Sequence, residues 1–547
     1  MSDLFANLAL GFEVVFQTAN WGVTAFGHTL TIPIPVNIIY CLIGALVGTL
    51  VGVLPGIGTV ATVAMLLPIT FGLQPVGALI MLAGIYYGAQ YGGSTTSILV
   101  NIPGEATSVI TTLDGFQMAK QGRAGPALAI AAIGSFAAGC VATVLIALLG
   151  APLTKLALAF GPAEYFSLMV LGLVFAVVLA KGSLLKAIAM IVLGLLLSMV
   201  GSDVETGASR MAFSIPELAD GLGFATVAMG LFGFAEIIRN LDHGAEEDRN
   251  LVQEKVTGLM PTKKDLAESA PAIARGTVLG SLLGILPGGG AVISSFASYT
   301  LEKKIAKDPS RFGRGAIEGV AGPESANNAA AQTSFIPLLT LGIPPNAVMA
   351  LMVGAMTIHG IIPGPQVMAN QPNLVWGMIV SMWIGNLMLL IINLPLVGVW
   401  VSLLRVPYRL LFPSIVVFCA IGIYSIGSAP TDVILAAVFG LVGYWLVKHD
   451  FEVAPLLLGM VLGPLMEDNL RRAMLIARGD ASIYFWRCVA PAGHSLPNST
   501  QKILDFSDYA KGCISPGLLL LSLILIVVAV LPAISRQRDV VFVESEN

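Results

Sequence analysis

Seven polar residues share one fourteen-residue stretch, AGPESANNAAAQTS at 321–334, in a sequence that is otherwise strongly apolar. Their amide and hydroxyl groups offer neutral oxygens to Na⁺ and neutral donors to a carboxylate. A second stretch of this kind, YGGSTTSILVNIPGEATS, occupies 91–108. Such groups are costly at membrane depth, so both stretches are candidate binding sites. Two other roles fit the same residues, namely hydrogen bonding between membrane helices and a solvated loop.

Each stretch also holds one glutamate, Glu105 or Glu324. Two interpretations of these carboxylates stay open at the level of sequence. Either residue could bind a cation or carry a proton during transport across a membrane. Either could instead cap the start of a helix, where a side-chain oxygen accepts a backbone N–H.

The hydrophobicity of the remaining sequence indicates a membrane protein. Of the 547 residues, 56% are hydrophobic and only 11% are charged, and the mean hydropathy is +0.86. A spanning helix needs roughly 20 mostly apolar residues, and many runs of that length occur. We therefore predict an all-α polytopic membrane protein with about 12 transmembrane helices.

Several function classes are excluded by what the sequence lacks. The net charge is −4 and no long basic tract occurs, so no nucleic-acid partner is expected. The five cysteines form no CxxC pair, and no metal site or cofactor is expected beyond a coupling ion. The P-loop pattern, G-x-S-x-G and H-E-x-x-H are all absent, so we predict no catalytic residues and no enzyme.

Two glycine–proline motifs interrupt the apolar pattern at corresponding places. GTLVGVLPGIG at 48–58 and GSLLGILPGGG at 280–290 share G-x-L-x-G-x-L-P-G-x-G, and NIPGEA at 101–106 has a later counterpart in GIPPNA at 342–347. Two matches in the same order predict two internal repeats, and proline with glycine predicts broken helices or re-entrant hairpins. Interrupted segments in both halves indicate the binding site of a secondary transporter.

The predicted organisation follows these breaks and the charged segments. Five basic residues at 302–315 place that segment in the cytoplasm. The predicted parts, in chain order, are an N-terminal interfacial segment (1–30), a first membrane repeat (31–238), a polar inter-repeat loop (239–275), a second membrane repeat with scaffold helices (276–465), and a C-terminal polar segment with the last helix (466–547).

The motifs together resemble a known family. GVLPGIGTVATVAMLLPITFGL, LPGGGAVISSFASYTLEK, LMEDNLRRAMLIARGD and the two polar stretches with their flanks look like the large permease subunit of the bacterial tripartite tricarboxylate transporters. The likeness runs from about residue 15 to about residue 480. The polar segment 486–517 departs from it, because the resemblance implies a shorter turn there.

The resemblance implies an architecture, partners and an energy source. It implies a multi-pass protein of the bacterial inner (plasma) membrane that works with a small membrane subunit and a periplasmic solute-binding protein. It also implies uptake of di- and tricarboxylates driven by an ion gradient, typically of sodium. A proton-coupled carboxylate symporter and a passive anion channel are the alternatives, and an intramembrane enzyme or an assembly scaffold is a more distant one.

The candidate substrate- and ion-binding residues combine the interrupted segments with the resemblance, and suspected Na⁺ binding falls at the same positions. They are Pro55, Gly56, Gly58, Gly92, Gly93, Ser94, Thr95, Thr96, Asn101, Gly104, Glu105, Pro287, Gly288, Gly289, Gly290, Glu324, Ser325, Asn327, Asn328, Pro344 and Asn346. We expect the polar stretches to form two re-entrant or broken-helix tips that meet in one site at the membrane midplane.

Overall fold

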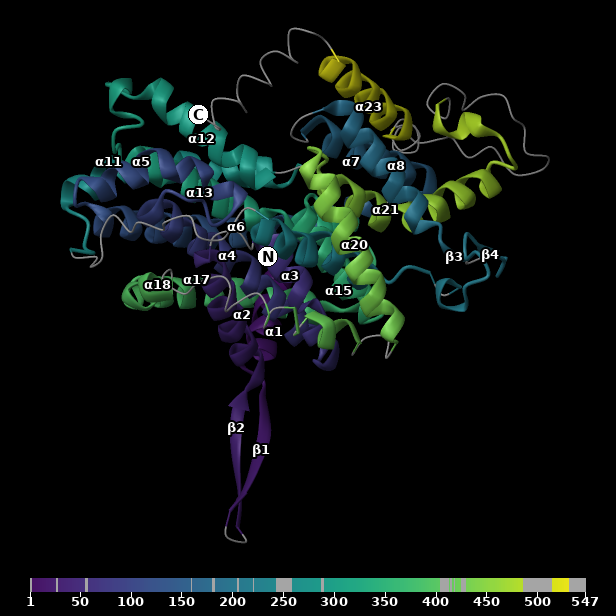
Figure 1. Cartoon of the computed structure of the whole chain (residues 1–547), viewed down its shortest axis with the longest axis horizontal. Coiled ribbons are helices and arrows are strands. Elements are labelled where there is room, and N and C mark those ends of the chain that lie inside the picture. The colour runs from purple at the N-terminus through teal and green to yellow at the C-terminus, as the bar shows by residue number, and fades with distance from the viewer. Residues whose placement is uncertain are drawn as a thin grey trace. The chain divides into compact units, whose positions relative to one another are not determined.

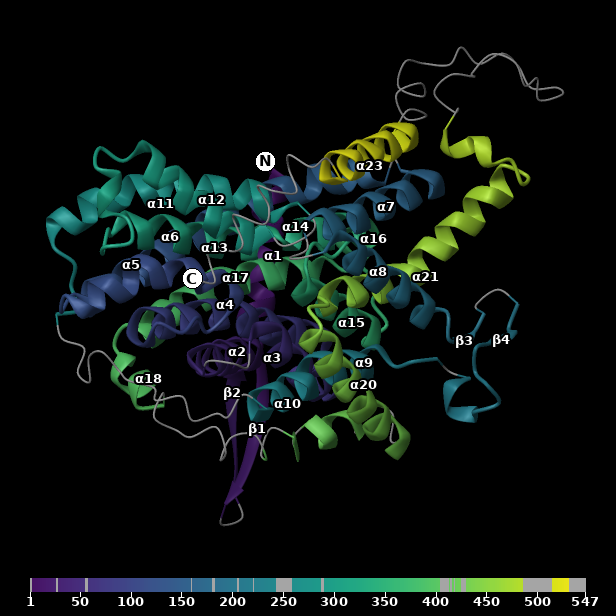
Figure 2. The ribbon, with the colours of Figure 1, turned by 45° about the horizontal axis from the view of Figure 1, so that its top comes forward.

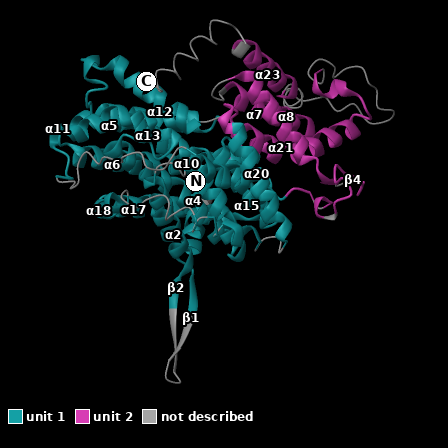
Figure 3. Ribbon diagram, viewed as in Figure 1, with its two compact units in different colours: residues 1–151, 223–446 teal, residues 152–222, 447–547 magenta. Residues whose placement is uncertain are grey.

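The computed structural model describes most of the chain and shows a helical protein (Figure 1). The described residues are 2–25, 28–54, 58–158, 160–179, 183–203, 206–219, 221–242, 258–286, 290–403, 413, 416–417, 419–424, 429–485 and 514–530. They fall into two compact units, 1–151 with 223–446 and 152–222 with 447–547, which Figure 3 colours separately. Both glycine–proline motifs and both polar stretches belong to unit 1.

Unit 1 contains most of the helices and one β-hairpin. Its elements from the first part of the chain are α1 (Ser2–Phe16), β1 (Thr18–Ala25), β2 (His28–Pro35), α2 (Val36–Val53), α3 (Thr59–Leu66), η1 (Leu67–Gly72), α4 (Pro75–Val100), η2 (Ala106–Ser108), α5 (Val109–Lys120) and most of α6 (Ala124–Ala157). Its later elements are α9 (Phe224–Ala228), the π-helical η4 (Met229–Phe234), α10 (Ala235–Asp242), α11 (Lys263–Gly284), α12 (Gly290–Ile305), η5 (Pro309–Arg311), α13 (Glu318–Thr333), α14 (Phe335–Leu341), α15 (Ala347–Ile358), α16 (Pro365–Asn370), α17 (Pro372–Asn393), α18 (Val397–Leu403) and α20 (Pro430–Lys448).

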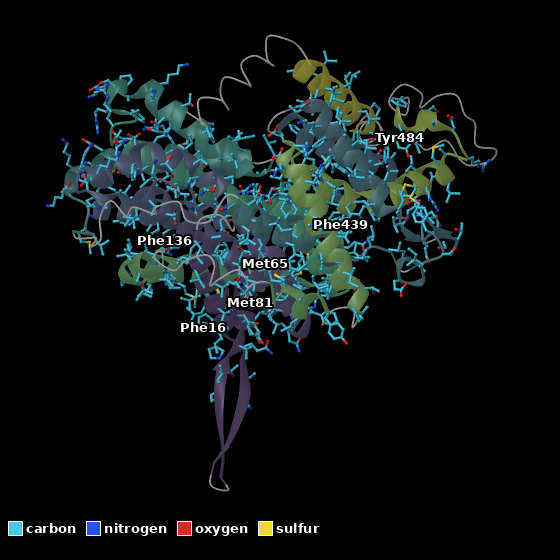
Figure 4. All side chains as sticks on the ribbon, in the orientation of Figure 1. Phe16, Met65, Met81, Phe136, Phe439 and Tyr484 are labelled. Atoms are coloured by element: carbon cyan, nitrogen blue, oxygen red, sulfur yellow. The ribbon has the colours of Figure 1, made fainter. Side chains whose placement is uncertain are left out.

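Unit 2 is a smaller helical group. Its elements are α7 (Pro162–Leu179), α8 (Leu184–Ser198), β3 (Gly201–Ser202), β4 (Ser209–Arg210), η3 (Pro216–Leu218), α21 (Val453–Ile476), η6 (Ala481–Tyr484) and α23 (Ile514–Val530). An aromatic pair packs within it: the ring centroid of Tyr484, which Figure 4 labels, lies 5.2 Å from that of Phe166. Arg471 binds both carboxylate oxygens of Asp203, at 3.1 and 2.6 Å, which fastens the β3–β4 loop to α21.

The helices confirm an all-α membrane protein in its main features. Among the described residues, five helices (α2, α6, α17, α20 and α21) are long and apolar enough to cross a membrane. Shorter apolar helices accompany them, including α7, α8, α15 and α23. Interruption by proline and glycine shortens several of these elements, as expected where a helix is broken.

Glycine seams hold the interrupted helices of unit 1 together. Three glycines of α2 face backbone carbonyls of α4, and a Cβ on each would come within 2.4 Å of the carbonyl oxygen: Gly44 at Met81, Gly48 at Ile85 and Gly52 at Ala89. Three glycines of α11 face α13 with the same four-residue spacing: Gly276 at Gly322, Gly280 at Ala326 and Gly284 at Ala330. Because only glycine allows such close approach of two backbones, these pairs are fixed in register.

The predicted helix breaks are present. α2 ends at Val53 before the first motif, and α3 begins at Thr59 after it. Likewise α11 ends at Gly284, and α12 begins at Gly290. Gly58 has a φ of 72°, a left-handed value that favours glycine, so it turns the chain into α3.

Two segments differ from the sequence-based expectation. Residues 263–275 were expected in a loop but form the first turns of α11, because Thr262 and Asp265 make a reciprocal capping box with bonds of 2.9 and 3.1 Å. The N-terminal segment is helix α1 followed by the β1–β2 hairpin, which extends away from the helices in both views (Figures 1 and 2). Gly11 brings α1 against α17, where a Cβ would lie 2.4 Å from the Trp376 carbonyl.

Candidate functional site

The polar stretch 91–108 lies at the end of α4 and in the loop that follows it. Gly92, Gly93, Ser94, Thr95 and Thr96 are all buried in the last turns of α4. The helix stops at an exposed Asn101 with φ 62°, a left-handed C-cap of the kind that asparagine tolerates. The loop then turns back and starts η2 and α5.

The stretch 321–334 is not a tip, which corrects the sequence-based prediction. Residues 321–333 form the buried interior of α13, and Ser334 joins α13 to α14. Two of its polar side chains, Glu324 and Asn328, bond hydroxyls on neighbouring helices, so these groups find protein partners while the helix backbone stays unbroken. Asn328 shows this, because its Nδ2 donates to Ser135 Oγ of α6 at 2.7 Å.

Glu105 begins the helical segment after the α4 loop. It stands at the N-cap position of η2, as the capping interpretation predicts, and its backbone N–H donates to Ser108 Oγ at 3.4 Å. Its carboxylate also accepts the hydroxyls of Thr59 and Thr107 and the amide of Asn327, whose Nδ2 lies 3.5 Å from Oε1. Side chains from α3, from the α4–α5 loop and from α13 therefore meet at one buried carboxylate.

Glu324 lies in the middle of α13 and caps no helix. Its Oε2 accepts the Ser94 hydroxyl at 2.6 Å, and its Oε1 accepts the Thr111 hydroxyl of α5. The carboxyl is 1% exposed. It therefore joins α13 to α4 and α5 across 230 and 213 residues of sequence.

Neither buried carboxylate has a basic partner. None of the ion pairs between described residues involves Glu105 or Glu324. A buried unpaired carboxylate is costly, so each must be neutralised by a bound cation or by a proton. Several buried polar atoms of the same region have no partner among the described residues: Asn327 Oδ1, Asn328 Oδ1, Gln332 Oε1 and Nε2, and the Tyr91 hydroxyl.

The loop GIPPNA repeats the backbone of the Glu105 loop. Gly342 ends α14 with φ 74°, as Asn101 ends α4. Asn346 then caps α15 with φ −153° and ψ 173°, close to the −150° and 166° of Glu105. The Asn346 Oδ1 accepts Met349 N–H at 2.9 Å, and its Nδ2 donates to Tyr86 on α4 at 3.4 Å.

The other candidate binding residues have packing roles or lie outside the residues that the structure describes. A Cβ at Gly104 would lie 2.1 Å from the Gly52 carbonyl, and one at Gly93 would lie 2.8 Å from Glu105 Cγ, so these glycines admit the loop against α2 and α4. The Thr96 hydroxyl donates to the Val53 carbonyl at 2.8 Å, beside the first break. Ser325 bonds within its own helix, to Ala321 O at 2.7 Å.

The structure does not bring the whole candidate set together. Thr95 bonds the Tyr91 carbonyl of its own helix at 3.5 Å, and Pro344 precedes the α15 cap without a polar side chain. Pro55, Gly56, Pro287, Gly288 and Gly289 lie outside the described residues, as does most of the 486–517 segment. What is brought together is the cluster of Glu105, Asn327 and Thr59 with the adjacent Glu324 contacts.

Sequence reasoning missed Asp114, a fully buried aspartate on α5. Its Oδ1 accepts the backbone N–H groups of Gly313, Gly315 and Ala316 at 2.9, 2.7 and 2.8 Å, and its Oδ2 accepts the Tyr299 hydroxyl at 2.9 Å. In the sequence, Asp114 is marked only as a lone acidic residue in an apolar segment. Its nearness to the basic segment 302–315 exists in space and cannot be seen along the chain.

These features define a class: an integral membrane protein with interrupted helices that bury acidic, hydroxyl and amide groups without a basic partner. Residues 38–458 match the family model described as "Tripartite tricarboxylate transporter TctA family". The chain belongs to this family, which supplies a membrane component of carboxylate transport and is not a family of enzymes.

Two relatives from Agrobacterium vitis agree with this membership. "Uncharacterized 52.8 kDa protein in TAR-I ttuC' 3'region" is 55% identical over 546 residues, covering 100% of both chains. "Uncharacterized protein in TAR-II ttuC' 3'region" is 55% identical over 267 residues, which are 49% of this chain and 100% of that protein. No solved structure matches the chain.

Proposed function

We propose that the protein is the large membrane subunit of a binding-protein-dependent secondary transporter that takes up di- or tricarboxylates with a sodium gradient. It works in the bacterial inner membrane with a small membrane subunit and a periplasmic solute-binding protein. The matched loops and glycine seams support two repeats within about 12 membrane spans. Family membership supports the transport role.

One observation carries the coupling part of the proposal. Hydroxyl, amide and carboxylate groups from segments up to 222 residues apart meet at Glu105 in the buried interior of unit 1. No basic side chain among the described residues neutralises them. A negatively charged substrate that enters such a site needs accompanying cations, which gives a physical reason for ion coupling.

The same observation sets the energetics. Each Na⁺ that moves inward gains about 2.3 kcal/mol for every 100 mV of membrane potential, in addition to its concentration gradient. Oxygen ligands of the kind collected here suit Na⁺. Movement of this site against a scaffold would then give access from each side in turn.

Uptake by the reconstituted complex tests this proposal. An inward sodium gradient is expected to raise the initial rate of carboxylate uptake at least about tenfold over sodium-free medium, because a cation that binds with the substrate is needed to neutralise the site. Undiminished uptake without sodium would overturn sodium coupling. Dependence on a pH gradient instead would indicate a proton-coupled symporter, and currents far above carrier turnover would indicate a channel.

Asn327→Ala separates transport from a scaffold role. The variant loses the amide that contacts Glu105, so uptake is expected to fall by about one order of magnitude or more, while the complex still assembles, because deleting a buried amide costs only about 1–3 kcal/mol. Co-purification of the subunits measures assembly. Normal uptake by the assembled variant would contradict a role for this residue in the transport site.

A further inference from the structure

The surroundings of the two buried glutamates differ in a way that concerns the coupling ion. Both oxygens of Glu324 accept a hydroxyl, one from Ser94 and one from Thr111. Each oxygen of the Glu105 carboxylate likewise accepts a hydroxyl, from Thr59 or Thr107, but this carboxylate also faces the amide of Asn327. Asn327 is 1% exposed, and its Oδ1 has no hydrogen-bond partner among the described residues. A buried amide oxygen without a partner is unfavourable, so it points to a ligand that binds at this position.

The geometry of the amide allows it to serve that ligand. The Asn327 nitrogen lies 3.5 Å from Glu105 Oε1, longer than a good hydrogen bond. The oxygen and nitrogen of an asparagine amide occupy nearly the same positions, and a half-turn exchanges them. After that turn the Asn327 oxygen faces the Glu105 carboxylate, and a cation between the two would replace a weak hydrogen bond by two oxygen ligands.

The charge at this position selects a monovalent ion. One carboxylate without a basic partner is balanced by a single positive charge. Among the described residues no group of three or more His, Cys, Asp or Glu side chains comes together, as a divalent site would favour. The Thr59 and Thr107 hydroxyls place two further oxygens beside the Glu105 carboxylate. A protonated carboxyl needs only one hydrogen-bond acceptor, so this larger set of oxygens favours a cation over a proton.

We infer that the coupling sodium ion binds at Glu105, with the Asn327 amide oxygen and the Thr59 hydroxyl as further ligands, and that Glu324 is neutralised by a proton and takes no cation. Glu324 positions α13 against α4 and α5 through its two hydroxyl contacts. The inference rests on the proposed function and names the position of the ion within it. Because the ligands come from α3, the α4–α5 loop and α13, ion binding draws both polar stretches together.

Sodium-dependent thermal stability tests the inference without transport. The purified full-length chain in detergent is melted at increasing NaCl, with choline chloride holding the ionic strength constant. Sodium should raise the melting temperature of the wild type in a saturable way, because a ligand that binds only the folded protein stabilises it. Glu105→Gln is expected to weaken the apparent sodium affinity at least about 30-fold, and Asn327→Ala about tenfold.

Glu324→Gln is the matched control, since it makes the same isosteric change at the other buried carboxyl. It should keep the sodium affinity of the wild type within about threefold, even if its melting temperature without sodium is lower. Thr111→Val, which removes a contact of Glu324 alone, serves the same purpose if Glu324→Gln does not accumulate. An unchanged sodium response in Glu105→Gln, or its loss in both controls, would overturn the assignment.

These outcomes separate the inference from the proposed function. If Glu105→Gln still responds to sodium while sodium drives uptake by the wild type, the ion position is wrong and sodium coupling stands. If the wild type responds to pH and not to sodium, both the position and sodium coupling fail. Potassium and lithium at equal concentration measure whether the site discriminates between monovalent ions.

Discussion

Replacing Gly280 by leucine is expected to prevent accumulation of the folded protein. Gly280 lies in the α11–α13 seam, where a Cβ would come 2.2 Å from the Ala326 carbonyl oxygen and 2.7 Å from its Cα. Both contacts are with backbone, so no side-chain rotation relieves them. Overpacking of a tight site costs about 1–3 kcal/mol and more where backbone must move, and here two helices must separate.

The measurement is the amount of purified protein and its melting temperature in detergent. Gly280→Ala should give an intermediate effect, because one methyl group meets the same carbonyl. Gly398→Leu is the control: it also places leucine in a helix, but a Cβ at Gly398 has nothing within 4 Å. Wild-type yield and melting temperature in Gly280→Leu would show that the seam is not closely packed.

The helix breaks could be predicted because they are local. Proline with two glycines ends a helix whatever surrounds it, and both motifs separate helices as expected. The loop match was predictable for the same reason, since backbone angles at Glu105 and Asn346 follow from short loops between two helices. The four-residue glycine spacing of α2 and α11 is also a local pattern, so it can be read directly from the sequence.

The environment of 321–334 could not be predicted in the same way. Its residues are compatible with a buried helix, a solvated loop or a tip, and what decides is the supply of partners on other helices. Those partners, Ser94 and Thr111 for Glu324 and Ser135 for Asn328, lie 193 to 230 residues away. Polar content therefore identified the region of the site, whereas its conformation depended on tertiary contacts.

Helix α5 connects two features that are far apart in the sequence. Thr111 donates to Glu324 in the buried cluster, and Asp114, three residues later, binds the segment between α12 and α13. On a helix these positions are neighbours one turn apart. We therefore expect a shift of the 313–316 segment to act through α5 on the Glu324 contact, since both ends are held by hydrogen bonds.

Asp114→Ala is expected to have the second large effect. The substitution leaves three buried or half-buried backbone N–H groups and the Tyr299 hydroxyl without their acceptor, each at a cost of about 1–3 kcal/mol where water cannot replace it. Asp114→Asn should be milder, because its amide oxygen can still accept the three N–H groups. Melting temperature in detergent orders the variants.

Asp308→Ala provides the comparison on the same segment. Asp308 is exposed, and its carboxylate accepts the hydroxyl and N–H of its near neighbour Ser310, which hold the pKa of that carboxyl below its usual value. Its loss should leave the melting temperature close to that of the wild type, as is usual for surface positions. If Asp114→Ala melted as Asp308→Ala does, the three N–H groups would have another acceptor. If instead it melts lower and also slows uptake, the α5 connection to Glu324 transmits the change, because Asp114 itself lies outside the proposed ion position.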